Sequence, residues 1–544
     1  MEMKNLNKIF FSNDFGWSKI KYKDSSIFFK GYLYNDNFSN IIRTIFNIKN
    51  KKKYIKNLDG MFAFIATKKT EVIAVTDKIS SIPIFFQKDK NEIIVSNKSQ
   101  LIQDRKKNKL LKKSLTSIFM SGYTIGNSTI YENINAIEAG TYLVSYQNKI
   151  KFIKYYKFEP WKYKKNISLK LLEKKYNDCN LKVFNKLKTY CDTNSLGVAV
   201  SLTAGYDSRL IVSMLKKFKF KNILCFTYGI KNNHEVKAAR KICKYLNIKH
   251  VYIETNNLKV KKVCKTKHFK KLQKNSEQSL SVLDNVEYLV ISELKNKRLL
   301  DNKIILNGLS GDFISGGHQL EKFLDPSRKG LDQTIDAIIK KHFKLWLGKD
   351  EFINYEIIND LLKDYFIKLK VKIKKKNNFG LIEHFDLFNR QSKYSLSRQQ
   401  VYDYFNVKWI LPHFDIEYLN FWQKVEPSLK TNQKLYDIFL RKKNYEGVWA
   451  EKKWANLRLK RPRPFSVHSI LLIPLLKFLF FYDRKKYHLY FTKYLDYFNE
   501  ITSGYGEFNY LNDIIKKKNF FRNCASLKVE RYISQLVKKL KIKN

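Results

Sequence analysis

The sequence has few cysteines, and the six it has are scattered. They stand at positions 179, 191, 225, 243, 264 and 524 of a 544-residue chain, with no CxxC pair and no regular spacing. A disulfide framework or a zinc site needs paired or regularly spaced ligands, so this pattern argues against both. We therefore expect a protein of a reducing compartment.

Long apolar runs are also missing. The first residues, MEMKNLNKIFF, contain no signal-peptide core, from which we expect a cytoplasmic protein. The most apolar segment, SILLIPLLKFLFFY at 469–482, contains Pro474 and Lys477 and is too short to span a bilayer, so we expect no transmembrane segment. We expect a buried helix pair there, with a peripheral membrane contact as the alternative because residues 484–486 are basic.

Acidic residues are scarce relative to basic ones. The chain has 105 Lys and Arg against 49 Asp and Glu, a net charge of +56. Such an excess can indicate nucleic-acid or anionic-membrane binding. The lysines occur in every region without one dense arm, however, so we favour a lysine-rich surface and expect no nucleic-acid partner.

A hydrophobic content of 44% indicates a folded protein.

Residues 1 to about 160 contain short apolar segments joined by polar turns. FIATKKTEVIAVT predicts a hairpin that turns at 68–70, and IPIFFQKDKNEIIVS predicts one that turns at 89–91. GTYLVSYQNKIKFIKYYKF predicts a third, with its turn near 147–148. Antiparallel sheet is therefore expected to dominate this part of the chain.

From about residue 166 the pattern changes to alternating helices and buried strands. A helical period in LLEKKYNDCNLKVFNKL leads into apolar strands at 196–202, 222–228, 249–254 and 302–308, with amphipathic helices after the first two strands. This alternation predicts a parallel sheet with helices on both faces, an α/β class of fold. The remainder of the chain has a mainly helical pattern.

The loop that follows the first of these strands, Thr203 to Ser208, has the character of a ligand-binding turn. In open parallel sheets, ligands bind beyond the carboxyl ends of the strands. Gly205 lets the backbone approach a ligand, and the amides at the start of the next helix favour an anion. Asp207 would repel a bare phosphate, which suggests Mg²⁺ between this carboxylate and phosphates. Alternatively, Asp207 only caps the helix.

A second loop, in NKIILNGLSGDFISGGH at 302–318, again follows a strand. It places Asp312 among four glycines, at 308, 311, 316 and 317. Two aspartates on neighbouring loops suit one or two magnesium ions bound to a triphosphate. The alternative is an ordinary glycine-rich connection.

These motifs resemble those of a known superfamily. LTAGYDS at 202–208 is similar to the Ser-Gly-Gly-x-Asp-Ser loop of N-type ATP pyrophosphatases, and NGLSGDF at 307–313 resembles the Ser-Gly-Glu-Gly-Ala-Asp-Glu motif of asparagine synthetases. Pro412-His413-Phe414-Asp415 stands where that family has Pro-Phe-Leu-Asp. The ordered set covers most of 196–445 and implies an adenine nucleotide α-hydrolase-like domain.

The resemblance also implies site residues. ATP and its pyrophosphate would contact Leu202, Thr203, Ala204, Gly205, Tyr206, Asp207, Ser208, Thr227 and Gly308, and Mg²⁺ would bind Asp207 and Asp312. The family has a catalytic lysine late in the chain, for which the candidates here are Lys460, Arg461 and Arg463. A surface basic cluster is the alternative interpretation of those three residues.

The N-terminal part resembles the glutaminase domain of the same family, through LDGMFAFIATKKTEVIAVTDKISSIPIFF at 58–86 and GNSTIYENINAIEAGTYL at 126–143. This implies a four-layer αββα sandwich of the N-terminal-nucleophile (Ntn) hydrolase type. We expect this domain at 1–160, the pyrophosphatase domain at 166–465 and a helical extension at 466–544. The family's nucleophile is a cysteine exposed at residue 1. Here residue 2 is Glu2 and the first cysteine is Cys179, so we expect glutaminase activity to be lost.

The resemblance implies an ATP-dependent amide-forming ligase that uses ATP and Mg²⁺. It would adenylate a small-molecule carboxylate, release pyrophosphate and join the acyl group to ammonia or an amine, with aspartate as one candidate acceptor. Leu309 and Phe313 replace two glutamates of the family's second motif. We therefore keep a catalytically inactive relative and a tRNA-modifying ATP pyrophosphatase as alternatives, and leave a homodimer open.

Overall fold

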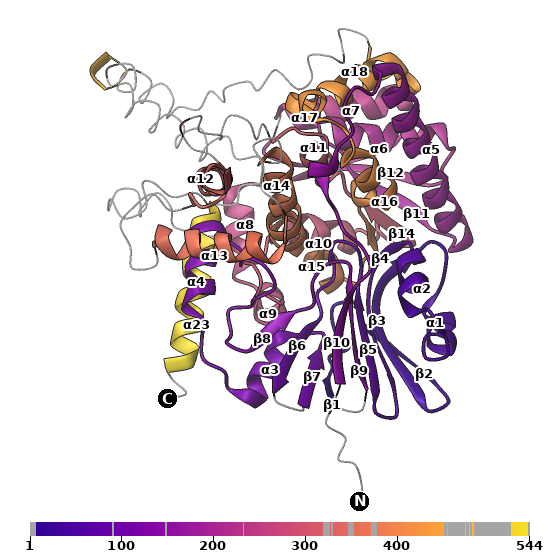
Figure 1. Cartoon of the computed structure of the whole chain (residues 1–544). Helices are drawn as coiled ribbons and strands as arrows, with labels where there is room; N and C mark the ends of the chain where they lie inside the picture. The colour runs from indigo at the N-terminus through magenta and orange to yellow at the C-terminus, as the bar shows by residue number, and fades with distance from the viewer. Residues whose placement is uncertain are drawn as a thin grey trace, which may run out of the picture.

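The computed structural model describes residues 7–89, 92–146, 149–231, 233–318, 327, 330–345, 353–371, 378–450, 454, 474, 478, 481–483 and 524–541. In Figure 1 the N-terminal strands stand in the lower half of the molecule, and most helices of the later chain lie above them. The two parts pack against each other, and one hydrophobic core contains residues of both.

The three predicted hairpins are confirmed. Each pair is antiparallel and turns where the sequence places its polar residues, with Lys68 opposite Glu71 and Asp89 opposite Glu92. The strands are β4 (Gly60–Lys68) with β5 (Glu71–Thr76), β6 (Phe85–Asp89) with β7 (Glu92–Ser96), and β9 (Thr141–Tyr146) with β10 (Lys149–Lys154).

These hairpins belong to two sheets. A six-stranded sheet has the order β10-β9-β5-β4-β3-β2, and a four-stranded sheet has the order β1-β7-β6-β8. The added strands are β1 (Asn7–Phe10), β2 (Ser18–Tyr22), β3 (Ser25–Leu33) and β8 (Ile134–Ala136). Strand β1 runs parallel to β7, a long-range pairing that the sequence pattern does not reveal.

Alternation along the strands builds four layers. On β4, Met61, Ala63 and Ile65 face the core between the sheets, while Phe62, Phe64 and Ala66 face a second core under α1 (Phe38–Thr44) and α2 (Lys51–Asn57). Helices α3 (Ser99–Lys106) and α4 (Lys112–Ser121) cover the outer face of the four-stranded sheet. Because successive side chains of a strand point to opposite faces, one strand serves both cores. The predicted αββα sandwich is confirmed.

The later chain forms a five-stranded sheet in which every pair is parallel, with the order β13-β12-β11-β14-β15. Its strands are β11 (Gly197–Ser201), β12 (Ile223–Gly229), β13 (Lys249–Glu254), β14 (Lys303–Leu306) and β15 (Trp409–Ile410). The first four match the predicted strands. Strand β15 was not predicted, because two residues are too few to show a period.

The order of this sheet creates a topological switch point. From β11 the chain moves outward to β12 and β13, and then β14 pairs with the opposite edge of β11. The connections after β11 and β14 therefore leave the same rim of the sheet and turn apart. In open α/β sheets, ligands bind in the crevice at this point.

Helices fill the rest of the described chain, as the sequence predicts. Before and between the strands lie η1 (Pro160–Lys162), α5 (Leu169–Thr193), α6 (Tyr206–Lys217), α7 (His234–Leu246), α8 (Asn257–Cys264), α9 (Lys267–Asn275) and α10 (Tyr288–Asn296). After β14 come α11 (Gly311–Ile314), α12 (Gly330–His342), α13 (Tyr355–Lys368), α14 (Asn378–Phe385), the π-helix η4 (Asp386–Ser395) and α15 (Gln399–Tyr404). The last are η5 (Pro412–Phe414), α16 (Ile416–Trp422), α17 (Pro427–Lys430), η6 (Thr431–Gln433), α18 (Lys434–Lys443), η7 (Tyr445–Gly447) and α23 (Cys524–Lys541).

The expected buried helix pair at 469–482 is wrong for the aromatic residues that are described there. Phe478, Phe481 and Tyr482 are 71%, 86% and 84% exposed. The other residues of this segment, apart from Pro474, lie outside the described part of the chain. Among the described helices, none combines the length and apolar character needed to cross a membrane.

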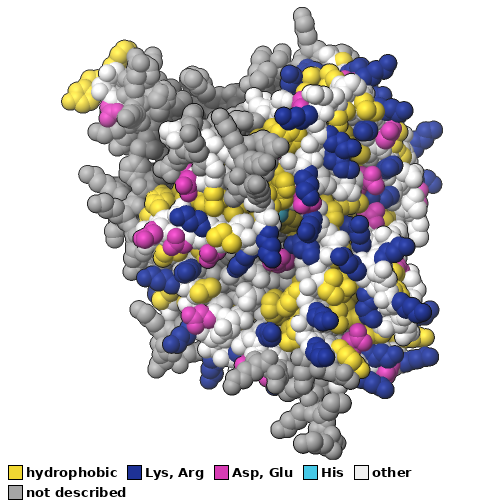
Figure 2. Space-filling model, viewed as in Figure 1, with side chains coloured by type: hydrophobic (Ala, Val, Ile, Leu, Met, Phe, Trp, Pro, Cys, Tyr) yellow, Lys and Arg dark blue, Asp and Glu magenta, His cyan; other side chains and the backbone are white. Residues whose placement is uncertain are grey.

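The surface shows how the excess of positive charge is distributed. Lys and Arg side chains occur over both halves of the face in Figure 2, with Asp, Glu and apolar side chains between them. On this face the basic residues do not gather into one continuous patch. This distribution agrees with the interpretation that the charge is spread over the surface.

Candidate functional site

The loop between β11 and α6 is organised by its own hydroxyl groups. The Ser208 hydroxyl accepts a hydrogen bond from the Thr203 amide (3.0 Å) and lies 3.2 Å from the Thr203 hydroxyl. The Gly205 amide donates to the Thr203 hydroxyl (3.1 Å). Gly205 is the N-cap residue of α6, and its missing side chain leaves the helix start uncovered on that side. The positive end of the helix dipole lies here.

Asp207 and Asp312, the two predicted metal ligands, are brought together at this rim. The Asp312 amide donates to the Asp207 carboxylate (2.9 Å), and the Tyr436 hydroxyl donates to its other oxygen (3.2 Å). Since Gly205 is the N-cap residue, Asp207 does not hold that position. The interpretation of Asp207 as a simple helix cap is therefore not supported.

Two glycines of the second loop allow this approach. A Cβ atom on Gly308 would lie 2.8 Å from the Ser208 amide nitrogen, and one on Gly311 would lie 2.4 Å from the carboxylate carbon of Asp207. Real Cβ atoms do not come this close to such atoms. The glycines therefore fit the loop against Asp207, which an ordinary glycine-rich connection would not require.

Side chains of the core beneath the first loop form hydrogen bonds with its remaining residues. The Thr227 hydroxyl, at the end of β12, donates to the Leu202 carbonyl (2.7 Å) and lies 3.0 Å from Nε2 of His250. Burial lowers the pKa of His250 to about 4, so its ring is neutral. Leu202 and Ala204 are buried, whereas Thr203 is exposed. Thr227 thus supports the loop from within the core.

Side chains outside the recognised motifs complete the loop. The Ala204 amide donates to the Glu235 carboxylate of α7. The guanidinium of Arg209, a side chain that is 1% exposed, donates to the Ala204 carbonyl (2.7 Å) and lies over the ring of Trp449 (4.9 Å). Glu235 and Arg209 therefore bind the two peptide groups on either side of Ala204.

A buried ionic network adjoins Asp312, and the sequence analysis did not find it. Nδ1 of His318 is 2.9 Å from the Asp386 carboxylate, and its Nε2 is 3.7 Å from that of Asp312. The Lys341 ammonium donates to Asp386 (2.7 Å). The nearby Lys341 and His318 charges hold the pKa of Asp386 well below its usual range, although burial opposes this. Asp386 begins a π-helix, a feature common at functional sites.

His413 also holds the backbone of Asp207 in place. Its Nε2 donates to the main-chain carbonyl of Asp207 (3.3 Å), and burial lowers its pKa to about 4, which keeps it neutral. The predicted catalytic candidates Lys460, Arg461 and Arg463 lie outside the described residues.

The chemistry of Asp207 and Asp312 fits magnesium bound together with phosphates. Mg²⁺ takes oxygen ligands, keeps several waters and uses one or two carboxylates when substrate phosphates complete its shell. The Asp312 side chain is 51% exposed, so it can face such a ligand. Within the described part of the chain, no group of three or more His, Cys, Asp or Glu side chains could hold a metal by itself.

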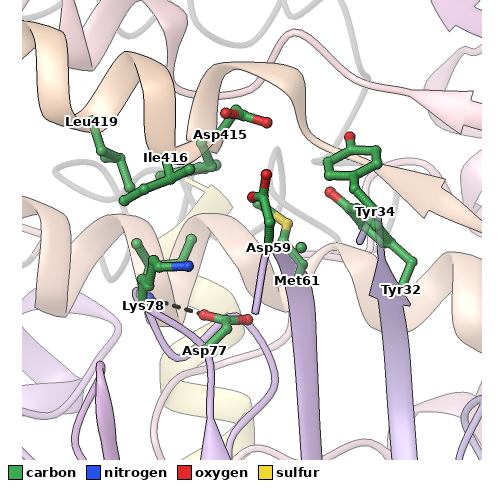
Figure 3. Close-up of a pocket in the computed structure, with 12 residues that line it drawn as sticks. Tyr32, Tyr34, Asp59, Met61, Asp77, Lys78, Asp415, Ile416 and Leu419 are labelled. Carbon is green, nitrogen blue, oxygen red and sulfur yellow. Dashed lines mark hydrogen bonds between the residues drawn. The ribbon is translucent and has the colours of Figure 1, made fainter. Parts of the chain in front are cut away.

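A second candidate region lies where the two parts of the chain meet. Figure 3 shows a small cavity in which Asp59 and Asp415 point toward one another beside Tyr34. Lys186 of α5 donates to both carboxylates, at 2.7 Å and 2.9 Å. Burial raises the pKa of Asp415 to about 6. None of the described residues lining this cavity is a cysteine.

The described cysteines all belong to the later part of the chain. Those whose side chains are described are Cys179, Cys191, Cys225, Cys243 and Cys264, and none of the five forms a disulfide. Burial raises the pKa of Cys179 and of Cys191 to about 12. The thiolate is the nucleophilic form of cysteine, so these two thiols are unreactive at neutral pH.

An αββα sandwich joined to a parallel sheet, with paired aspartates at the switch point, defines a two-part protein of the amidotransferase and ATP pyrophosphatase class. Residues 40–156 match the glutamine amidotransferase domain family, and residues 194–442 match the asparagine synthase family. The chain belongs to an asparagine synthetase-like family with amidotransferase and ATP pyrophosphatase parts.

Other comparisons are more distant. No curated protein matches the chain significantly. Solved structures that match include an NH3-dependent NAD synthetase from Campylobacter jejuni, with 16% identity and a TM-score of 0.19 over 28% of this chain and 61% of that one. An NMN synthetase from Francisella tularensis matches with 16% identity and a TM-score of 0.21, over 42% of this chain and 95% of that one. A glutamine phosphoribosylpyrophosphate amidotransferase from B. subtilis also matches, with 12% identity and a TM-score of 0.19, over 43% of this chain and 72% of that one. The chain thus spans less than two thirds of the Campylobacter enzyme, and TM-scores this low carry no argument about activity.

Proposed function

We propose that the protein is an ATP-dependent carbon–nitrogen ligase that adenylates a carboxylate and releases pyrophosphate. The observation that carries this proposal is the convergence of the two loops, with the Asp312 amide 2.9 Å from the Asp207 carboxylate at the switch point. The match to the asparagine synthase family over 194–442 supports the reaction type. The acceptor is a small-molecule carboxylate, for which aspartate is one candidate.

The residues at this rim of the sheet have different roles in the proposed reaction. The Thr203–Ser208 loop and the start of α6 hold the phosphates, because amide and hydroxyl donors gather there. Asp207 and Asp312 would hold Mg²⁺, which neutralises charge on the phosphates when it is bound. A substrate carboxylate attacks the α-phosphorus, and pyrophosphate leaves. Ammonia or an amine then attacks the acyl-adenylate, giving an amide and AMP.

We also propose that nitrogen does not come from glutamine hydrolysed in the N-terminal part. The described thiols lie elsewhere, and the described lining of the cavity between the two parts has no cysteine. The nitrogen donor is then free ammonia or an amine-bearing substrate. The N-terminal part contributes packing, since its core continues into that of the parallel sheet.

The test is pyrophosphate release from ATP and Mg²⁺. Reactions contain aspartate with ammonium, aspartate with glutamine, or a panel of other carboxylates with ammonium. We expect release with ammonium and not with glutamine. Asp207→Asn removes a proposed Mg²⁺ ligand and should decrease release by about a hundred-fold, since a displacement of about 1 Å at a reacting centre costs about this much. Asp89→Asn, which removes an aspartate that is 60% exposed, is the matched control and should behave as wild type.

One observation favours an inactive relative as the second candidate. Both oxygens of the Asp207 carboxylate already accept hydrogen bonds, and Phe313, where the family has a glutamate, is 2% exposed and packs on His318. Failure of ATP to bind, with no pyrophosphate released under any condition, would establish that alternative and refute the ligase. A tRNA-modifying enzyme would instead release pyrophosphate only when RNA is added.

A further inference from the structure

A small polar cavity lies at the junction of the two parts of the chain. Trp17 and Lys30 of the N-terminal part line one side of it, and Gln399 of α15 and Trp409 of β15 line the other. In Figure 1, α15 stands just above the N-terminal strands. The proposed ATP site uses the loops after β11 and β14 and shares none of the described lining residues of this cavity. Binding in the cavity therefore does not depend on the proposed function.

The side chain of Gln399 is a polar group on this wall that the described protein does not satisfy. It is 2% exposed, and among the described residues neither its amide oxygen nor its amide nitrogen has a hydrogen-bond partner. The neighbouring Gln400 also lines the cavity, but its amide group bonds to the Glu277 main chain at 2.7 Å and 3.0 Å. Burying a polar group is costly unless it is hydrogen-bonded. A ligand that both donates and accepts hydrogen bonds would satisfy Gln399.

One lysine on the wall forms no ion pair with a described carboxylate. The Lys393 ammonium donates to the main-chain carbonyls of Thr124 (2.8 Å) and Gly126 and to one side-chain amide oxygen, all of them neutral. Burial lowers its pKa to about 7. Lys98, also on the wall, is instead 2.6 Å from the Asp14 carboxylate. A ligand carboxylate near Lys393 would favour the charged form of that lysine.

One carboxylate on the wall has, likewise, only neutral hydrogen-bond donors among the described residues. Glu277 accepts from the amides of Ser99 (2.8 Å) and Ser279 (2.9 Å) and from the Ser99 hydroxyl. The other carboxylate of the lining, Asp403, is paired with Lys30 at 2.5 Å. The walls therefore present one cation and one anion, each without an ionic partner in the described part of the chain.

We propose that this cavity binds a small free amino acid in its zwitterionic form. The ligand carboxylate lies toward Lys393, its ammonium lies toward Glu277, and the Gln399 amide bonds to either end. A simple anion or a simple amine fits less well, because it leaves one of the two wall charges unmatched. The cavity volume is about 80 Å³, and one water needs about 10–15 Å³ of such space, so glycine or alanine fits and a nucleotide does not.

The experiment measures binding of L-alanine to the full chain by calorimetry, without nucleotide. We expect Gln399→Leu to weaken binding at least ten-fold. Gln535→Leu, which makes the same change at an exposed glutamine of α23, should bind as wild type does. Equal binding by wild type and Gln399→Leu overturns the proposal. No binding by wild type at millimolar alanine overturns it as well, because water alone would then bond to Gln399.

Two measurements separate loss of binding from loss of the fold. Gln399→Leu should keep the thermal stability of the wild type, because it replaces a buried amide that lacks protein partners by an apolar group. Glu277→Gln keeps an oxygen that can accept from the Ser99 and Ser279 amides but removes the charge, and it should also weaken alanine binding at least ten-fold. Wild-type affinity in Glu277→Gln would contradict the place given to the ligand ammonium.

A series of ligands tests the assignment to a small zwitterion. Propionate has the carboxylate of alanine without its ammonium, and ethylamine has the ammonium without the carboxylate. Each should bind at least ten-fold more weakly than alanine, and equal binding by either would overturn the zwitterion. L-Tryptophan is too large for the cavity and should also bind at least ten-fold more weakly; affinity equal to that of alanine would place the ligand elsewhere.

A last variant locates the amino acid relative to the proposed ATP site. Asp207→Asn should bind alanine as wild type does. Loss of binding in that variant, with binding kept in Gln399→Leu, would place the amino acid at the ATP loops and overturn the proposal. Alanine binding by a chain that releases no pyrophosphate under any condition would support the cavity and refute only the ligase.

Discussion

Replacing Gly311 by alanine tests whether the closeness of the two loops matters for function. The added Cβ would lie 2.4 Å from the carboxylate carbon of Asp207 and 2.5 Å from one of its oxygens. Both atoms belong to the carboxylate, which can rotate away, and the Cβ atom of Asp207, at 3.0 Å, needs only a small further shift. The substitution therefore moves one functional group in an otherwise unchanged fold.

The size of the effect follows from this overlap. Non-bonded carbon atoms rest at about 3.5–4.0 Å, so the carboxylate must move by about 1 Å. It then loses the hydrogen bond from the Asp312 amide, and a hydrogen bond to a charged group contributes about 1.5–3 kcal/mol. A displacement of about 1 Å at a reacting centre lowers a rate by about a hundred-fold.

The assay compares pyrophosphate release and Mg²⁺-dependent ATP binding in Gly311→Ala with those in Gly330→Ala. At Gly330 nothing lies within 4 Å of an added Cβ, but φ is +58°, so alanine there strains the backbone without touching Asp207. We expect Gly330→Ala to lose some stability and keep nucleotide binding. Gly311→Ala should lose release, with a loss of stability no larger than that one hydrogen bond contributes, about 1.5–3 kcal/mol.

A double mutant shows whether the effect passes through Asp207. If Gly311→Ala acts by displacing that carboxylate, adding it to Asp207→Asn should cause no further loss, because interacting positions are not additive. Independent, additive losses would refute the reasoning. Wild-type pyrophosphate release by Gly311→Ala would refute it as well.

Further predictions concern the ionic networks. Lys186→Met removes the cation shared by Asp59 and Asp415 and should lower the free energy of unfolding by about 3 kcal/mol at pH 7.5. The loss should be smaller at pH 5, where Asp415, with a pKa of about 6, is protonated; an equal loss at both pH values in urea denaturation would contradict this. Because that pKa is raised, Asp415 itself favours folding below about pH 4, and this contribution is lost as the pH rises through 6. Asp386→Asn leaves the Lys341 cation buried without its partner and should cost about 3–5 kcal/mol, with little change between pH 5 and 8 because the Asp386 pKa lies well below its usual range. A cost under about 1 kcal/mol in the same assay would contradict it.

Local pattern was enough to predict most of the secondary structure. The hairpin turns at 68–70 and 89–91, and the strands that became β11 to β14, follow from side-chain period and turn residues. Short or long-range features were not predictable in this way. Strand β15 has two residues, and β1 pairs with β7 across a long stretch of sequence.

The same distinction applies to the candidate site, because some of its residues could be selected from the sequence and others could not. Asp207 and Asp312 could be selected from the sequence because each follows a buried strand in a loop that contains glycine. Asp386 and Lys341 could not, because nothing in their local sequence distinguishes them from other polar residues on helices, and the sequence of the second loop does not show that His318 meets Asp386. The expected burial of the apolar segment at 469–482 failed for Phe478, Phe481 and Tyr482, since hydropathy does not say what covers a helix.

The sequence by itself determined the alternation of strands and helices, the two loops with their aspartates and the family to which the chain belongs. The tertiary structure alone decided that the loops touch. Their contact depends on β14 pairing with the free edge of β11, which sets both carboxyl ends at one rim. Local pattern fixes where a side chain lies on its own element, and only packing fixes which other elements it meets.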